Sequence, residues 1–190
     1  MKIIIITRED HVHDEAMLIN HFFDCGLQRL HIRKPSWSLA ETEDLLQKID
    51  SRHHPNIVLH DNFSLLNKYS LGGVHLNRRN DSLISEVPMT TSASCHSFSE
   101  VIEKKAKYDY LFLSPIFDSI SKKGYKTPFL RHDLEHARDE GVIDDRVIAL
   151  GGVTAERLHD VKTIGFGGAA ILGDAWDNPK KYCYLLEYGV

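Results

Sequence analysis

The fold is decided by the stretch VIALGGV (Val147–Val153) and by its counterpart IGFGGAAILG (Ile164–Gly173). Each is an apolar run closed by glycine, and a charged, helix-like segment at 154–163 separates the two, which indicates strand, helix, strand. Glycine lets an anion approach backbone N–H groups closely. Two such turns in consecutive units indicate the phosphate site of a βα barrel, formed after its last two strands. Either turn alone is also explained by the tight bend that glycine permits.

The same alternation of strand and helix runs through the rest of the chain. Eight β-rich runs predict strands at Lys2–Thr7, Leu27–Arg33, Asn56–His60, Gly73–Leu76, Met89–Ser94, Tyr110–Ser114, Arg146–Leu150 and Gly168–Leu172. Helical patterns predict helices between them at Asp14–Asp24, Ser38–Ile49, Ser64–Tyr69, Ser97–Lys107, Arg131–Glu140 and Thr154–Thr163, and a last one at Pro179–Glu187. Each parallel crossover needs such a helix, so eight units predict a closed (β/α)8 TIM barrel, one domain over residues 1–190. A doubly wound open sheet is the alternative.

The composition and net charge of the chain limit the kinds of function that it can have. The chain has 190 residues, 42% of them hydrophobic and 26% charged, with a net charge of −4. These values are ordinary for a globular protein, and the negative charge argues against a nucleic-acid partner. The apolar run Ile3–Ile6 is too short for a signal peptide or a membrane span, so we expect a cytoplasmic protein without a membrane partner. Cys25, Cys95 and Cys183 are too widely spaced for a zinc motif or a disulfide framework.

Polar and cationic side chains close the predicted strands, where the chemistry of a barrel takes place. They are His31, Arg33 and Lys34, then His60 and Asp61, then His75, Asn77, Arg78, Arg79 and Asn80, then Ser94, Cys95 and His96, and finally Ser114. Arginine offers a planar fork for phosphate oxygens and lysine a point charge. The set therefore indicates a phosphorylated small-molecule substrate, although His31 and His60 are equally well explained as satisfied core histidines.

Several of these stretches, in this order, resemble the thiamine phosphate synthase and TenI family along nearly the whole chain. They are His31-Ile32-Arg33, His60-Asp61, Gly73–Leu76, Ser94–Ser97, Asp109-Tyr110, Pro115–Phe117, Ser119–Gly124 and Ala149–Val153. The resemblance implies a (β/α)8 barrel, usually a homodimer, that handles a thiazole phosphate in thiamin biosynthesis.

The resemblance implies a role for individual residues. Arg33 and Lys122 correspond to diphosphate contacts, Ser119 and Ser121 to the thiazole side, and Ser94 to a pyrimidine contact. Gly151, Gly152, Leu172 and Gly173 correspond to the cradle of the thiazole phosphate. The synthase branch joins a pyrimidine diphosphate to the thiazole phosphate with Mg²⁺ held by two aspartates, of which Asp61 is one. The TenI branch includes a thiazole tautomerase that shifts a proton and needs no cofactor.

The chain departs from the site residues of both the synthase and the tautomerase, and these departures decide which activity we expect. His31 stands where the synthase has glutamine, His60 where it has asparagine, and Asn80 where it has its other aspartate, while Pro115 stands where the tautomerase has its histidine. We therefore expect a TenI-like thiazole tautomerase with His96, His31 and His60 as catalytic residues. The alternatives are a thiamine-phosphate synthase with Mg²⁺ on Asp61, and a non-catalytic regulator that binds a phosphate of the pathway.

Overall fold

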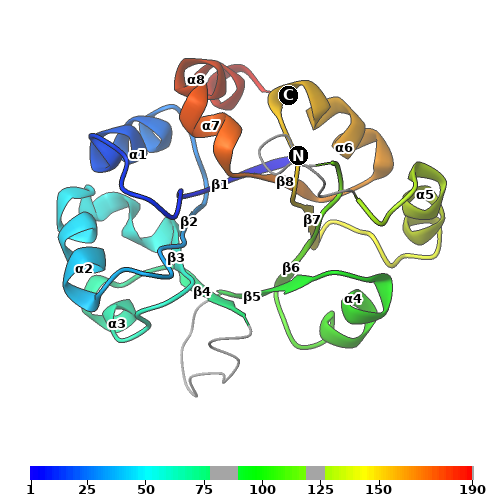
Figure 1. Ribbon diagram of the computed structural model, residues 1–190, viewed down its shortest axis with the longest axis horizontal. Helices are drawn as coiled ribbons and strands as arrows, with labels where there is room; N and C mark the ends of the chain where they lie inside the picture. The colour runs from blue at the N-terminus through cyan, green and yellow to red at the C-terminus, as the bar shows by residue number, and fades with distance from the viewer. Residues whose placement is uncertain (78–89, 119–126, 190) are drawn as a thin grey trace.

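Eight parallel strands close into a barrel in the computed structural model, which describes residues 1–77, 90–118 and 127–189 (Figure 1). The strands are β1 (Lys2–Ile6), β2 (Leu30–Ile32), β3 (Ile57–Leu59), β4 (Gly73–Leu76), β5 (Thr90–Cys95), β6 (Tyr110–Leu113), β7 (Val147–Ala149) and β8 (Gly168–Ile171). Each strand pairs with the next in the sequence, and β1 pairs with β8 to close the ring, from Lys2 opposite Gly168 to Ile5 opposite Ile171. The predicted (β/α)8 barrel and its eight strands are confirmed.

Helices surround the ring (Figure 1). They are α1 (Glu15–Asp24), α2 (Leu39–Lys48), α3 (Leu65–Tyr69), α4 (Phe98–Lys104), α5 (Arg131–Asp139), α6 (Leu158–Ile164), α7 (Gly173–Asp177) and α8 (Pro179–Tyr188), with 3-10 turns η1 (Ser51–Asn56) and η2 (Ala155–Arg157). The predicted capping box is present at α2, where the Ser38 side chain accepts from the Glu41 N–H. None of the described helices is long and apolar enough to cross a membrane.

Two apolar layers hold the barrel together. The larger one fills the space between strands and helices, and it includes Ile5, Phe22, Leu59 and Tyr182, each fully buried. The smaller one lies inside the ring and is formed by Ile4, Ile6, Phe112, Ile148 and Ala170. Successive residues of a strand point to opposite faces, so alternate residues of one strand serve the two layers.

The short helix α7 was not predicted. Its indole Trp176 Nε1 donates to the Ile6 carbonyl at 2.8 Å, and Trp176 packs edge-on against Phe22 of α1. These tertiary contacts fix a five-residue helix that its own sequence pattern does not indicate. The chain thus leaves β8 through a turn at Leu172-Gly173, and the helix that follows is anchored to the end of β1 by Trp176.

Candidate active site at the carboxyl end of the barrel

Five of the predicted site residues lie at one end of the barrel. Because all eight strands run parallel, their carboxyl ends form one rim, and Arg33, Asp61, His96, Gly151 and Gly173 each follow a strand there. The expectation that these residues share a rim is confirmed. Of the other predicted contacts, Ser119, Ser121 and Lys122 lie outside the described residues, as do Arg78, Arg79 and Asn80.

The turn after β7 needs glycine for two reasons. Gly151 and Gly152 have φ of 90° and 64°, in the left-handed region. A Cβ at Gly152 would also lie 2.5 Å from the Asp118 carbonyl oxygen, and one at Gly151 would lie 2.8 Å from Pro115 Cα. The bare turn thus lets the loop after β6 pack directly on it. Among the described residues, no acceptor is recorded for the N–H groups of Gly151, Gly152 and Val153, so the turn offers donors to an anion.

Arg157 stabilises this turn by a hydrogen bond to its backbone. A role for this residue was not predicted from the sequence. Its Nη1 donates to the Gly152 carbonyl at 2.9 Å, and its guanidinium lies 4.8 Å from the Phe117 ring centroid. With the carbonyl oxygen engaged by Arg157, the peptide is fixed and the cation adds positive potential near the turn.

Asp174 joins the two glycine turns. Its Oδ2 accepts from the Ala155 N–H at 3.0 Å and from the Tyr182 hydroxyl at 2.6 Å, while Oδ1 accepts from Asn178 Nδ2 at 2.8 Å. Burial, and then the Asp174 carboxylate, raise the pKa of Tyr182, so its hydroxyl stays a donor. One carboxylate therefore ties the segment after β7 to α7 and α8.

Two cationic residues, Arg33 and Lys34, follow β2, and their side chains lie in different environments. Arg33 forms an ion pair with Glu9, and its N–H donates to the Thr7 hydroxyl at 2.9 Å, which joins the ends of β1 and β2. Arg33 also contributes to lowering the pKa of the inward-facing His75, after the larger effect of burial. The Arg33 charge therefore acts at the mouth of the barrel.

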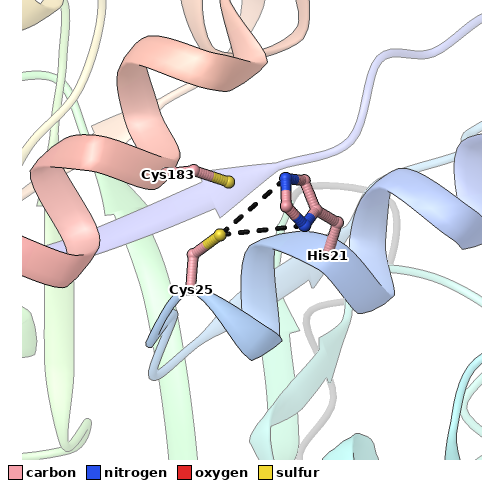
Figure 2. A group of neighbouring side chains, drawn as sticks. All are labelled: His21, Cys25 and Cys183. Carbon is pink, nitrogen blue, oxygen red and sulfur yellow. Dashed lines mark hydrogen bonds between the residues drawn. The ribbon is translucent and has the colours of Figure 1, made fainter.

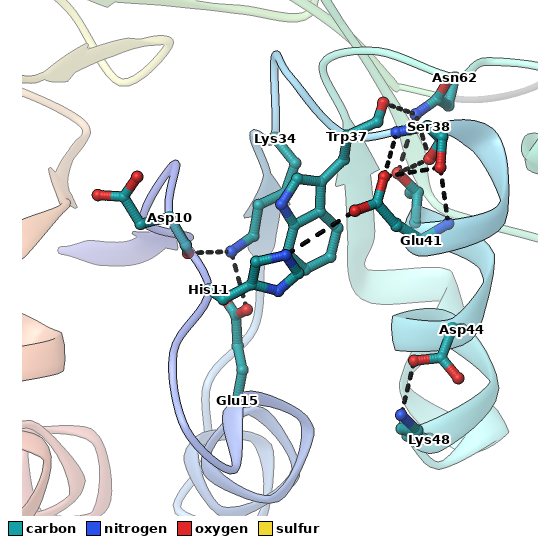
Figure 3. Close-up of polar contacts among 11 residues, drawn as sticks. Asp10, His11, Glu15, Lys34, Trp37, Ser38, Glu41, Asp44, Lys48 and Asn62 are labelled. Carbon is teal, nitrogen blue, oxygen red and sulfur yellow. Dashed lines mark hydrogen bonds and ion pairs between the residues drawn. The ribbon is translucent and has the colours of Figure 1, made fainter.

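Lys34 points away from the mouth, as the alternation of a strand predicts. It is 2% exposed, and its Nζ donates to Glu15 Oε2 and to the Asp10 carbonyl, both at 2.8 Å, above the Trp37 ring (Figure 3). Burial lowers the pKa of Lys34 and raises that of Glu15, while their hydrogen bond opposes both shifts. Lys34 is thus a structural cation that links β2 to α1.

Asp61 and Asn77 provide oxygen ligands between β3 and β4. Asp61 is half-buried just beyond β3, and Asn77 donates its Nδ2 to the His60 carbonyl at 3.1 Å. Mg²⁺ commonly takes one or two carboxylates together with substrate phosphates. The donor chemistry at this part of the rim therefore fits Mg²⁺.

His96 is an exposed residue at the end of β5. Its Nδ1 lies 3.0 Å from the Ser114 carbonyl oxygen. A carbonyl can only accept, so Nδ1 carries a proton and donates it to Ser114.

His31 and His60 lie inside the barrel rather than on its rim. They are 0% and 4% exposed. His31 Nδ1 lies 2.9 Å from His60 Nε2, and His31 Nε2 lies 2.7 Å from the Tyr110 hydroxyl. Burial, and then the charges of His75 and Arg29, hold the pKa of His31 well below its usual range. His31 is therefore a neutral ring with both nitrogens engaged.

His75 completes this polar half of the interior. Its Nδ1 and Nε2 each lie 2.9 Å from a serine hydroxyl, those of Ser92 and Ser94, and its ring stacks on His60 at 4.2 Å. Burial first, then Arg33 and Lys104, lower the pKa of His75 to about 3. Ser94, a predicted pyrimidine contact, thus also serves as a partner of His75.

The chain is similar to known proteins over most of its length. The family model described as thiamine monophosphate synthase matches residues 3–174. A solved thiamine phosphate pyrophosphorylase from Bacteroides thetaiotaomicron is 38% identical, with a TM-score of 0.85 over 94% of this chain and 86% of that one. The curated thiamine-phosphate synthase of Actinobacillus pleuropneumoniae serotype 7 is 24% identical over 86% of this chain and 82% of its own length. A thiamine phosphate pyrophosphorylase from Pyrococcus furiosus, 17% identical with a TM-score of 0.68, shares the fold.

Proposed function

Because this chain belongs to the thiamine monophosphate synthase family, we propose that it is a thiamine-phosphate synthase. It joins a pyrimidine diphosphate to a thiazole phosphate at the carboxyl rim of the barrel and releases pyrophosphate. The observation that carries the proposal is the glycine turn at Gly151-Gly152, whose backbone N–H groups have no acceptor among the described residues. The chain is also 38% identical to a protein described as a thiamine phosphate pyrophosphorylase.

The two anionic groups have different partners in this proposal. The thiazole phosphate lies against the backbone of Gly151, Gly152, Leu172 and Gly173, where Arg157 adds positive charge. The diphosphate lies near Arg33, which follows β2 on the same rim, with Lys122, and the pyrimidine lies near Ser94. Ser119 and Ser121 contact the thiazole. Charge develops on the leaving pyrophosphate, and preorganised cations stabilise such charge in the transition state.

Asp61 is the residue that would hold Mg²⁺ in this reaction, together with the diphosphate oxygens. When bound, Mg²⁺ neutralises the diphosphate and so makes it a better leaving group. Arg33 orients the same group by its guanidinium fork. Since a single described carboxylate supports the ion, we expect Mg²⁺ affinity to depend on the presence of the diphosphate substrate.

A thiazole tautomerase, the function expected from the departures in sequence, is the second candidate. His96 favours it, because its imidazole is exposed at the end of β5, where it can reach a bound substrate. His31 and His60 do not support it as further proton carriers, because they are buried and hydrogen-bonded to one another. A displacement of pyrophosphate needs no such carrier, which is why the synthase is preferred.

Turnover of both substrate sets by the purified protein separates these functions. We expect Mg²⁺-dependent formation of thiamin phosphate, with one pyrophosphate released per product. His96→Asn should reduce this turnover by less than about 10-fold, whereas loss of general acid–base catalysis in a tautomerase costs about 10²–10⁴-fold. Tautomer conversion without thiamin phosphate would overturn the proposal, and binding of a thiazole phosphate without either turnover would indicate a regulator.

The remaining parts of the proposal are a cytoplasmic location and a homodimer. Tyr184 and Tyr188 of α8 are 64% and 72% exposed, and their rings lie 4.8 Å apart. A surface pair of aromatic rings is a common element of protein interfaces. Tyr182 of the same helix is buried instead. Sedimentation of the wild type and of Tyr184→Ala tests the dimer, since the variant should shift it toward monomer.

A further inference from the structure

Two cysteines from opposite ends of the chain meet on the outside of the barrel, away from the rim. Cys25 follows α1 directly, and Cys183 lies in α8, which packs against α1. Their sulfur atoms lie within 4.8 Å of one another, and the two residues are 4% and 7% exposed. Figure 2 shows both sulfur atoms turned toward the same point, together with the imidazole of His21.

The spacing on both helices brings further ligands to that point. His21 and Cys25 are four residues apart, and so are Cys183 and Glu187, so each pair occupies one face of its helix. The ligand atoms that meet at this point belong to His21, Cys25 and Cys183. The two helices therefore direct one imidazole nitrogen and two thiol sulfurs toward each other.

The distances agree with a tetrahedral metal centre. The ligand atoms of His21, Cys25 and Cys183 all lie within 4.8 Å of one another, and Cys25 Sγ is 3.8 Å from His21 Nδ1 and 3.9 Å from Nε2. A zinc tetrahedron with Zn–S of about 2.3 Å and Zn–N of about 2.0 Å has ligand–ligand separations of about 3.5–3.8 Å. Both nitrogens of the exposed His21 ring lie at nearly the same distance from Cys25 Sγ, so each of them is a candidate ligand atom.

We propose that His21, Cys25 and Cys183 bind a thiophilic divalent cation of the Zn²⁺ class, with a water molecule in the fourth position. Two thiolates and a neutral imidazole balance the charge of the ion, and the thiol protons leave to solvent. His21 also lines a groove of about 1000 Å³ between α1 and α2, so this ligand is reached from solvent. Binding joins the first helix of the chain to the last.

Cobalt spectroscopy tests this proposal on the full-length protein under reducing conditions. One equivalent of Co²⁺ should produce a thiolate-to-metal charge-transfer band and the intense visible bands of tetrahedral Co²⁺. Zn²⁺ should abolish these bands by displacement, and it should raise the thermal midpoint of the wild type. Because the chain has twelve histidines, the sulfur-specific band is the readout that separates this site from adventitious binding.

Variants then assign the ligands. Changes outside the ligand shell already cost about 10–100-fold in metal affinity, so Cys25→Ser, Cys183→Ser and the exposed His21→Ala should each lose more than about 100-fold. Cys95→Ala is the matched control, because Cys95 is a buried thiol far from α8, and it should keep the band. His21→Ala leaves the core intact, so it remains informative if a cysteine variant unfolds.

Three results would overturn the proposal. The first is the absence of a charge-transfer band in the wild type, and the second is an unchanged band in Cys183→Ser or His21→Ala. The third is a disulfide in place of a metal site, seen as loss of two free thiols on air oxidation in a protein that binds no Co²⁺ through sulfur when reduced.

Discussion

At the scale of single residues, the two turns differ in their need for glycine: Gly152 has no room for a side chain, whereas Gly173 has room for one. A Cβ at Gly152 meets the Asp118 carbonyl at 2.5 Å, whereas one at Gly173 meets only Asp177 Oδ2 at 4.0 Å. Gly152→Ala should therefore destabilise the protein by about 1–3 kcal/mol through overpacking. Gly173→Ala should change the free energy of unfolding by less than about 0.5 kcal/mol. Urea denaturation of both variants checks this contrast, and equal destabilisation would contradict it.

Because Gly173 tolerates a side chain, it gives the cleaner test of the phosphate cradle. Gly173→Asp puts a negative charge beside the proposed anion, and two unit charges at 4 Å repel by about 1 kcal/mol in water and about 4 kcal/mol near a protein surface. The Kd for thiazole phosphate, measured by calorimetry, should rise at least about 10-fold. The matched neutral variant Gly173→Asn should bind almost like the wild type. Equal affinity of the two variants would remove Gly173 from the cradle.

Single residues also mark the limit of prediction from sequence. A polar residue at the end of a strand can point into the barrel or toward its mouth, and a step of one or two positions decides which. His31 and His96 look alike in this respect, yet His31 is sealed between His60 and Tyr110 while His96 is exposed. Arg157 and Asp174 carry no motif of their own, because their roles come from contacts with segments distant in sequence.

At the scale of elements, Asp174 is the connection between the two halves of the proposed cradle. In Asp174→Asn, one of the two carboxylate oxygens becomes an NH₂ group, so a single acceptor remains for the three donors of Ala155, Tyr182 and Asn178. Leaving these groups unsatisfied should cost about 1–3 kcal/mol. It should also raise the KM for thiazole phosphate more than it lowers kcat, because the two turns lose their fixed separation.

The matched control for this variant is Asp177→Asn on the same helix. Asp177 forms an ion pair with Arg8 and its side chain is 61% exposed, and exposed pairs contribute about 0–1 kcal/mol. Thermal unfolding and steady-state kinetics of the two variants should differ accordingly. A loss in Asp177→Asn as large as in Asp174→Asn would show that the Asp174 carboxylate makes no particular contribution.

Element order and type were predictable because the physical signals are local. Short β-rich runs alternate with helical patterns, and Ser38 and Glu41 form the expected capping box at α2. The helix α7 was not predictable, because Trp176 and Tyr182 hold it through contacts with β1 and Asp174. The pairing of Cys25 with Cys183 follows only from the closed ring, which brings α8 next to α1.

At the scale of the whole molecule, the polar half of the barrel interior should make stability depend on pH. Burial lowers the pKa of His31, and it lowers that of His75 to about 3 from an ordinary value of 6.5. At pH values between about 3 and 6.5, His75 binds a proton in the unfolded chain but not in the folded protein. The free energy of unfolding should therefore fall as pH drops below about 6.5, by about 1.4 kcal/mol per pH unit for each such histidine.

Chemical denaturation at several pH values measures this slope. His75→Gln should reduce the slope near pH 5 by the contribution of one proton, about 1.4 kcal/mol per pH unit, whatever its effect on stability at neutral pH. His13→Gln is the control, because the His13 side chain is 94% exposed, and it should leave the slope unchanged. If His75→Gln keeps the full slope, His75 is not a buried neutral group.

The central claim concerns the whole barrel: its carboxyl rim holds the thiazole phosphate between the turns that follow β7 and β8. A crystal structure of the protein with thiazole phosphate bound is the most direct measurement. We predict that the phosphate oxygens accept from backbone N–H groups of Gly152, Val153 and Gly173, with the thiazole ring directed toward Ser94 and Arg33. A phosphate bound at the amino end of the barrel, beside Lys2, Arg29 and Arg146, would contradict the account.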